Sequence, residues 1–237
     1  MCGRYAASRS PEDLMVEYEA VDGTAGARLP ADYNLAPTMP VHAVRTRVRD
    51  GVRELSVVRW GLVPSWADDP RIGGRLINAR AESVTVKPAF RGAFARRRCL
   101  IPADGWFEWT ARVDRPGKQA YYLTPYDGAG LAFAGLWESW GNGDERLLTC
   151  TIVTTEAAAQ LTAIHDRMPL VLPRDRHAAW LDPDHPDPAA LLVPPPADVL
   201  AGLELRPVGP EVGNVANTGP SLLHRYDEPA PAAQTLF

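Results

Sequence analysis

The sequence is poor in cysteine and lacks the spacings that make cysteine structural. Its 237 residues contain three cysteines, Cys2, Cys99 and Cys150, with no Cys-x-x-Cys pair and no histidine at ligand spacing. An odd number of widely separated cysteines argues against a disulfide framework and against a structural zinc site. We therefore expect no metal, and we expect Cys99 and Cys150, which lie inside apolar runs, to be core residues.

Long apolar runs and glycine-rich nucleotide motifs are absent too. No apolar stretch approaches the roughly 18 residues of a transmembrane helix, and the N-terminus lacks the charged-then-apolar order of a signal peptide. There is no internal repeat and no Gly-x-Gly-x-x-Gly fingerprint. Because 46% of the residues are hydrophobic, the chain can form a large core. These features predict a globular cytoplasmic protein without membrane contact or cofactor.

Positive charge is scarce overall but concentrated in one segment. The formal net charge is −4, which by itself argues against a nucleic-acid partner. Residues 41–100 nevertheless hold thirteen Lys and Arg against five Asp and Glu, while the remainder holds twelve against twenty-four. Nearly all of these cations are Arg, which binds phosphate bidentately and stacks on bases. The segment predicts an anionic ligand, and an Arg-rich protein with exposed strand faces is the plainer alternative.

The first five residues, Met1-Cys2-Gly3-Arg4-Tyr5, place a cysteine directly behind the initiator methionine. Removal of Met1 would leave Cys2 with an α-amine of pKa about 7.7–8.0 and a thiol of pKa about 8.5, both partly deprotonated near neutrality. An aldehyde would form a Schiff base with the amine, which the thiol could close into a thiazolidine. An amide would instead be attacked by the thiolate, as in N-terminal-nucleophile hydrolases. An incidental second residue is the plain alternative.

Local patterns predict short helices and many strands. Ser10 followed by Pro11 is typical of a helix start, with Ser10 as the N-cap. The β-branched runs at 41–48 and 52–60 flank Arg49-Asp50-Gly51, which is a hairpin signal. A basic hairpin is therefore expected inside the Arg-rich segment.

Two later segments carry candidate reactive groups. The alternation over 106–109 predicts a strand on which Trp106 and Glu108 share a face. We expect a helix over 156–164 that delivers His165 at its end. A strand carboxylate is usually solvated, but one between tryptophans is more often semi-buried and paired.

At this point the chain resembles the SOS-response-associated peptidase (SRAP) family, whose members process abasic sites in single-stranded DNA. The matching motifs follow one another in the family's order along nearly the whole chain, and seven of them together are far more specific than any single one. They are Met1-Cys2-Gly3-Arg4-Tyr5, Tyr33-Asn34-Leu35-Ala36-Pro37, Trp60-Gly61-Leu62-Val63-Pro64, Asn78-Ala79-Arg80-Ala81-Glu82, Ala103-Asp104-Gly105-Trp106-Phe107-Glu108-Trp109, Ile164-His165-Asp166-Arg167-Met168-Pro169 and Val212-Gly213-Asn214-Val215.

The resemblance implies a fold and a reaction. The fold is α+β, a single domain over 1–226 with a β-barrel-like, mostly antiparallel core, a few short helices and a basic channel. We expect the Pro/Ala tail at 227–237 to be disordered. The implied reaction is covalent capture of the ring-opened aldehyde of an abasic site by Cys2.

The site residues follow from the same comparison and from the charge pattern. By analogy with the family, the catalytic candidates are Cys2, Asn78, Glu108 and His165. Arg4 and Arg80 are implied as phosphate contacts, and we add as DNA-binding candidates Asn34, Pro37, Trp66, Arg96, Arg97 and Arg98. Only Trp66 among the tryptophans is expected at the surface. Family members often have a second aromatic after it, where this chain has Ala67, so the wedge that separates bases is expected to be smaller here.

The chemistry also follows from the residue types. Glu108 can take a proton from an ammonium, and His165, with an ordinary pKa of about 6.5, can act as acid or base at the sugar oxygen. Asn78 can donate to developing oxygen charge without titrating. Each has a plainer alternative, because His165 could be a helix C-cap and Asn78 a turn residue.

Three functions remain open from the sequence. The first is a thiazolidine crosslink to abasic sites in single-stranded DNA, with a possible lyase activity. The second is an N-terminal-nucleophile peptidase or amidohydrolase, including self-removal of Met1, and the third is a non-covalent single-strand-binding module. We expect a monomer with single-stranded DNA as its partner, cytoplasmic and nucleoid-associated when bound.

Overall fold

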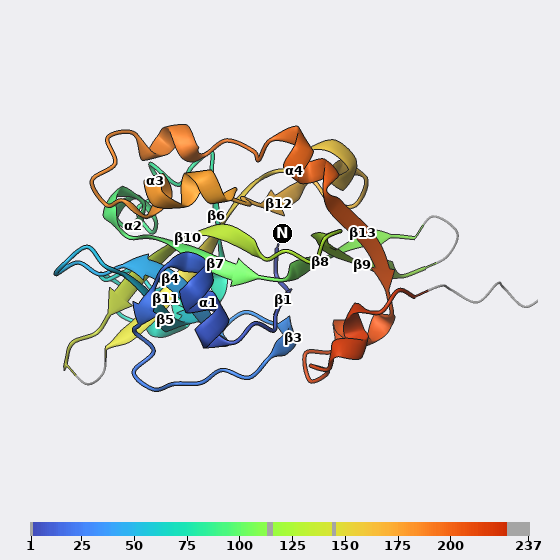
Figure 1. Ribbon diagram of the computed structural model, residues 1–237, viewed down its shortest axis with the longest axis horizontal. Helices are drawn as coiled ribbons and strands as arrows, with labels where there is room; N and C mark the ends of the chain where they lie inside the picture. The colour runs from blue at the N-terminus through green and yellow to red at the C-terminus, as the bar shows by residue number, and fades with distance from the viewer. Residues whose placement is uncertain (1, 113–115, 144–145, 227–237) are drawn as a thin grey trace, which may run out of the picture.

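A closed barrel forms the centre of the protein. The computed structural model describes residues 2–112, 116–143 and 146–226. Within them, five strands are hydrogen-bonded in the cyclic order β4, β7, β10, β11, β5 (Figure 1). Their bounds are β4 (Pro40–Thr46), β5 (Arg53–Trp60), β7 (Arg98–Ala103), β10 (Leu131–Trp140) and β11 (Leu147–Glu156). Only β5 and β11 are parallel, so the predicted β-barrel-like, mostly antiparallel core is confirmed.

Three short strands extend this barrel. β2 (Val21–Asp22) runs parallel to β5. β6 (Asn78–Arg80) is parallel to β11, and β12 (Arg167–Pro169) is antiparallel to its end. Thr154 of β11 pairs with both β6 and β12. Because a strand has one pairing edge on each side, β6 and β12 lie on opposite edges of β11.

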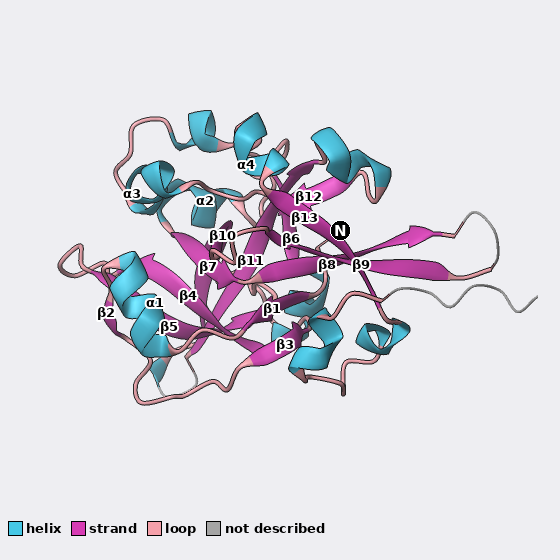
Figure 2. Ribbon diagram, turned by 45° about the vertical axis from the view of Figure 1, so that its right-hand side comes forward, coloured by secondary structure: helices cyan, strands magenta, loops and turns pink. Residues whose placement is uncertain are grey.

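A second, antiparallel sheet contains the N-terminal strand. Its order is β13, β9, β8, β1, β3 (Figure 2). The bounds are β1 (Tyr5–Ala7), β3 (Asp32–Leu35), β8 (Gly105–Ala111), β9 (Lys118–Pro125) and β13 (Leu203–Val208). The alternating segment around Trp106 is therefore a strand, as predicted. β1 lies between β8 and β3, and Cys2, three residues before Tyr5, is buried.

Short helices surround the two sheets. They are the α-helices α1 (Pro11–Tyr18), α2 (Arg91–Arg96), α3 (His177–Leu181) and α4 (Ala197–Ala201), and the 3₁₀ turns η1 (Pro70–Arg75), η3 (Ala159–Ala163), η4 (Arg174–Arg176), η5 (Pro188–Leu191), η6 (Pro210–Gly213) and η7 (Pro220–Leu223). The predicted N-cap is confirmed, because Ser10 Oγ accepts from the Asp13 N–H at 3.1 Å. Within the described ranges, no helix is long and apolar enough to span a bilayer.

The expected helix over 156–164 is wrong. β11 continues through Glu156, and only a 3₁₀ turn at Ala159–Ala163 follows. Residues 147–155 are rich in Thr, Val and Ile, whose branched side chains favour a strand, and β12 supplies a pairing partner there. Ala159 has φ 52°, a left-handed conformation that cannot begin an α-helix. The tail at 227–237 lies outside the described residues.

Aromatic residues fill the junction between barrel and sheet. Tyr5 makes edge contacts with Trp60 and Phe133, at ring-centroid distances of 5.3 and 6.0 Å. Trp60 and Trp106 are buried, and so are the thiols of Cys99 and Cys150, as predicted. These rings anchor β1 and cannot stack on a ligand.

Candidate active site and nucleic-acid interface

Cys2 lies at the inner end of the β1 segment. Its neighbour strands hold the backbone, since the Phe107 N–H of β8 donates to the Arg4 carbonyl at 2.9 Å. The Cys2 side chain is 0% exposed and belongs to the same apolar cluster as Tyr5 and Trp60. The fold therefore brings the start of the chain to a fixed position between the two sheets.

Asn78 fixes the carbonyl of Cys2. Its Nδ2 donates to Cys2 O at 2.8 Å. Asn78 is the first residue of β6, and its parallel pairing with Ile152 of β11 sets its position. The Oδ1 atom is buried and makes no hydrogen bond within the described part of the chain. Asn78 thus orients Cys2 through one of its two amide N–H groups.

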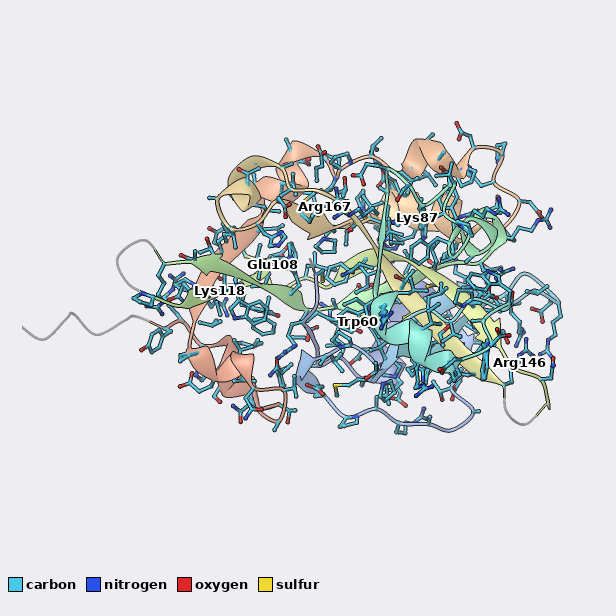
Figure 3. All side chains as sticks on the ribbon, turned by 180° about the vertical axis from the view of Figure 1, so that it is seen from behind. Trp60, Lys87, Glu108, Lys118, Arg146 and Arg167 are labelled. Atoms are coloured by element: carbon cyan, nitrogen blue, oxygen red, sulfur yellow. The ribbon has the colours of Figure 1, made fainter. Side chains whose placement is uncertain are left out.

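Glu108 places a buried carboxyl beside the start of the chain (labelled in Figure 3). It follows Phe107 on β8 and is 3% exposed. Burial raises the pKa of Glu108 to about 7, and the positive α-amino group at the start of the chain opposes this rise. A carboxyl that is half-ionised near neutrality can both accept and return a proton.

The thiol of Cys2 differs from the sequence expectation. Burial, reinforced by the charge of Glu108, raises the pKa of the Cys2 thiol well above its ordinary value. We expected a thiol partly deprotonated at neutrality, and that prediction is wrong for this environment. The thiol is neutral in the folded protein, so the thiolate is not the resting nucleophile.

His165 sits in the turn between η3 and β12. Its Nδ1 accepts from the Arg167 N–H at 2.9 Å and lies 2.7 Å from a carboxylate oxygen of Asp166. The first contact requires a lone pair on Nδ1, whereas the second requires a proton. Burial lowers the pKa of His165, against the opposing charge of Asp166. The neutral ring is therefore the resting form. The contact with the Arg167 N–H favours the proton on Nε2, whereas the contact with Asp166 favours it on Nδ1.

Arg4 and Asn34 form one buried polar connection. Arg4 Nη1 donates to Asn34 Oδ1 and to Val212 O, each at 2.8 Å. The Asn34 amide donates in turn to the carbonyls of Val212, Asn214 and Asn217. Because Asn34 is completely buried, its predicted DNA contact is contradicted; it orients Arg4 and ties down the 212–217 loop. Arg4 and Pro37 remain partly exposed.

The three consecutive arginines have three different environments. Arg96 is at the surface, with 73% of its side chain exposed. Arg97 is partly buried and donates to Glu138 at 2.7 Å. Arg98 is buried and donates to four carbonyls, those of Phe94, Ala95, Trp180 and Asp182. A phosphate contact for Arg98 is contradicted, because its guanidinium joins the C-terminal ends of α2 and α3.

Trp66 and Arg80 are on the surface, as required of ligand contacts. Trp66 is 60% exposed, and the neighbouring Ala67 carbonyl accepts from Trp140 Nε1 at 2.6 Å. Arg80 ends β6, two residues after Asn78. Both come from the predicted Arg-rich segment, which contains β6 and the hairpin of β4 and β5.

Sequence reasoning missed the pair Arg167 and Glu82. Arg167 Nη1 and Nη2 donate to the two oxygens of Glu82 at 2.8 and 3.0 Å. Both residues stand inside matched motifs, but nothing in the sequence indicates that the two motifs meet. In the described ranges, no cluster of three or more His, Cys, Asp or Glu is arranged to hold a metal ion.

Comparison with known proteins gives consistent matches. A sequence model of the family "SOS response associated peptidase (SRAP)" matches residues 1–215. The abasic site processing protein YoaM of Bacillus subtilis (strain 168) is 38% identical over 210 residues, covering 86% of this chain and 91% of YoaM. The abasic site processing protein YedK of Escherichia coli (strain K12) is 33% identical over 228 residues, covering 94% and 99%.

A solved structure shares the fold. A protein from Bacteroides thetaiotaomicron superposes with a TM-score of 0.82 at 23% identity, over 95% of this chain and 100% of that one. The arrangement of barrel and second sheet is therefore common to both chains.

Proposed function

Since the chain belongs to the SOS response associated peptidase (SRAP) family, we propose that it processes abasic sites in single-stranded DNA. Cys2, made the first residue by removal of Met1, would bond covalently to the ring-opened aldehyde. The names of the relatives support the substrate. One observation carries the chemistry: a buried carboxyl, Glu108, has its pKa about 7 beside the start of a chain whose Cys2 carbonyl is held by Asn78.

The reaction proceeds in two bond-forming stages. Glu108 takes a proton from the Cys2 ammonium, and the amine attacks the aldehyde carbon to give a carbinolamine. Return of a proton lets hydroxide leave as water, which produces the Schiff base. The Cys2 sulfur then bonds to the same carbon, the imine electron pair moves to nitrogen, and the thiol proton follows it. The product is a thiazolidine, and one water is released.

His165 and Asn78 assist at the sugar. The Nε2–H of the neutral His165 ring donates to the ring oxygen as the sugar opens, because protonation there makes it a better leaving group. The remaining N–H of Asn78 donates to the oxygen that develops negative charge during amine attack.

The strand would bind along basic residues that are exposed, as Arg80 and Arg96 are, or partly exposed, as Arg4 and Arg97 are. Arg4, Arg80, Arg96 and Arg97 are the phosphate-contacting candidates, and Trp66 offers a ring on which a base can stack. Pro37 lies in the loop before β4 and is partly exposed. The protein would act as a monomer in the cytoplasm, associated with the nucleoid while bound.

The test uses single-stranded DNA with one uracil, with and without uracil-DNA glycosylase. We expect a denaturation-resistant shifted band only after glycosylase treatment, and intact mass should show Met1 absent. Borohydride should trap the Schiff base, because only an imine is reduced to a stable amine. Binding without any covalent band would favour the non-covalent module and overturn the proposal.

Two further activities have distinct readouts in the same assay. A shortened oligonucleotide would indicate β-elimination, which is a lyase activity. Cleavage of a peptide amide bond by a chain that forms no crosslink would favour the peptidase. The neutral, buried Cys2 thiol argues against a resting thiolate and so favours the amine as first nucleophile.

A further inference from the structure

Arg167 connects the two segments that carry His165 and Asn78 (Figure 3 labels Arg167). Its backbone N–H donates to His165 Nδ1 at 2.9 Å. Its guanidinium makes the bidentate contact with Glu82 at 2.8 and 3.0 Å, and Nη2 also donates to Thr154 O at 2.7 Å. The Arg167 side chain is only 10% exposed. Arg167 is therefore hydrogen-bonded to His165 through its backbone and to β11 and Glu82 through its side chain.

Glu82 belongs to the Asn78 segment. It lies four residues after Asn78, and the Ala81 N–H between them donates to Thr154 O at 2.8 Å. The carbonyl of Thr154 thus accepts from the Asn78 segment and from Arg167. The hydrogen bond from Arg167 lowers the pKa of Glu82, so the carboxylate is charged at neutral pH. A bidentate pair of this kind fixes direction as well as distance.

The backbone fixes the η3 side of the turn, where the His165 N–H donates to Leu161 O at 3.1 Å. Arg167 is the first residue of β12, and its pairing with Glu156 is the last of the β11–β12 ladder. The Asp166 carbonyl accepts from the Ala157 N–H at 2.9 Å, which fixes one side of the turn. On the β12 side, the Arg167 guanidinium adds side-chain contacts to Glu82 and to Thr154 O.

We propose that Glu82 is a positioning residue for the reaction: by holding Arg167, it keeps the Arg167 N–H on His165 Nδ1 and sets the separation of His165 from Asn78. This inference rests on the proposed abasic-site chemistry for its kinetic consequence. Its structural consequence, the proton on Nε2 of His165, can be measured without DNA. Glu82 itself contacts neither Cys2 nor the reacting atoms.

If Glu82 acted only through its negative charge, the opposite effect of Glu82→Gln on the reaction rate would be expected, so the two roles can be told apart. Glu82 is a half-exposed carboxylate, and its neighbour Arg80 is a phosphate-contact candidate. If only charge mattered, Glu82→Gln would bind single-stranded DNA more tightly and react no more slowly, since a repelling charge is removed. If Glu82 positions His165, the variant binds undamaged DNA at least as well but reacts more slowly.

The kinetic experiment compares Glu82→Gln with wild type and with Glu12→Gln. Glu12 is 62% exposed on α1 and forms an ion pair with Arg28. Glu12→Gln therefore removes the same charge at an exposed position elsewhere. We expect the crosslinking rate at saturating DNA to fall about tenfold or more in Glu82→Gln, given that a small misplacement of a reacting group can cost about 100-fold. Dissociation constants for undamaged DNA should not rise, and Glu12→Gln should match wild type.

Two measurements decide against other roles. In a double-mutant cycle with Arg167→Lys, the combined loss should be no larger than the larger single loss, because both changes break one contact. Nitrogen-15 NMR of the free protein, with the His165 signal assigned by a His165→Gln variant, should show the Nε2–H tautomer in wild type and a mixture in Glu82→Gln.

The outcomes distinguish the positioning role of Glu82 from the proposed function. Wild-type protein that does not crosslink overturns the proposed function, while the NMR comparison still tests whether Glu82 positions His165. If wild type crosslinks and the crosslinking rate of Glu82→Gln is undiminished, only the positioning role of Glu82 is overturned. An unchanged His165 tautomer in Glu82→Gln overturns it as well.

Discussion

Removing the charge of Glu108 should stabilise the folded protein at neutral pH. Burial raises the pKa of Glu108 from its ordinary 4.5 to about 7. Between these pH values the folded state binds a proton that the unfolded state does not, so the free energy of unfolding falls as pH rises. At about 1.36 kcal/mol per pH unit, the loss is roughly 3 kcal/mol once the pH passes 7. The stability is fully present below about pH 4.5.

Glu108→Gln keeps the shape of the side chain but cannot ionise. Its free energy of unfolding, measured by urea denaturation, should exceed that of wild type by up to roughly 3 kcal/mol at about pH 7.5 and approach it near pH 4.5. Glu12→Gln on the exposed face of α1 is the matched control and should follow wild type. Parallel stability curves for wild type and Glu108→Gln would show that the buried carboxyl is not poised as described.

Four further outcomes are expected. Arg98→Ala should lower the free energy of unfolding by on the order of 3 kcal/mol, since four carbonyls lose their donor, and should leave the salt dependence of DNA binding unchanged. Arg96→Ala should reduce the slope of log K against log salt by about 0.7 without loss of stability in urea. Trp66→Ala should weaken binding of undamaged single-stranded DNA, measured by fluorescence anisotropy, by about 1–3 kcal/mol if one base stacks there. Cys2→Ser should lose the stable thiazolidine but still be trapped by borohydride, and absence of trapping would rule out the amine as nucleophile.

The local elements of the fold were predictable where one pattern dominated. The Ser10 cap, the hairpin of β4 and β5 and the strand at Trp106 each follow from a short-range signal. The segment after Thr154 was not predictable, because its helix signal competed with a strand that β12 completes from a distance. Closure of the barrel depends on the parallel pairing of β5 with β11, and no local pattern encodes a contact between strands so far apart in sequence.

The site shows the same division. The motifs indicated Cys2, Asn78, Glu108 and His165, and the fold brings Asn78 onto Cys2 and Glu108 beside the chain start. Burial was less predictable. Three adjacent arginines look alike in sequence, yet Arg98 enters the interior because it follows the last turn of α2 and starts β7.

The burial of Cys2 determines the order of the proposed steps. A thiol whose pKa is raised well above its ordinary value stays protonated near neutrality, so it cannot compete as the first nucleophile. In the proposed reaction, the α-amine of Cys2 freed by removal of Met1 would have an ordinary pKa of about 7.7–8.0, close to the value of about 7 for Glu108, so proton transfer between them would be nearly balanced. In the proposed mechanism the amine therefore attacks first. The thiol would then add to the imine carbon, which is already bonded to the nitrogen of the same residue. Because the two groups are held so close together, the thiol need not be ionised beforehand. Burial, which disfavours the thiolate of Cys2, is thus compatible with a thiol that acts in the second step.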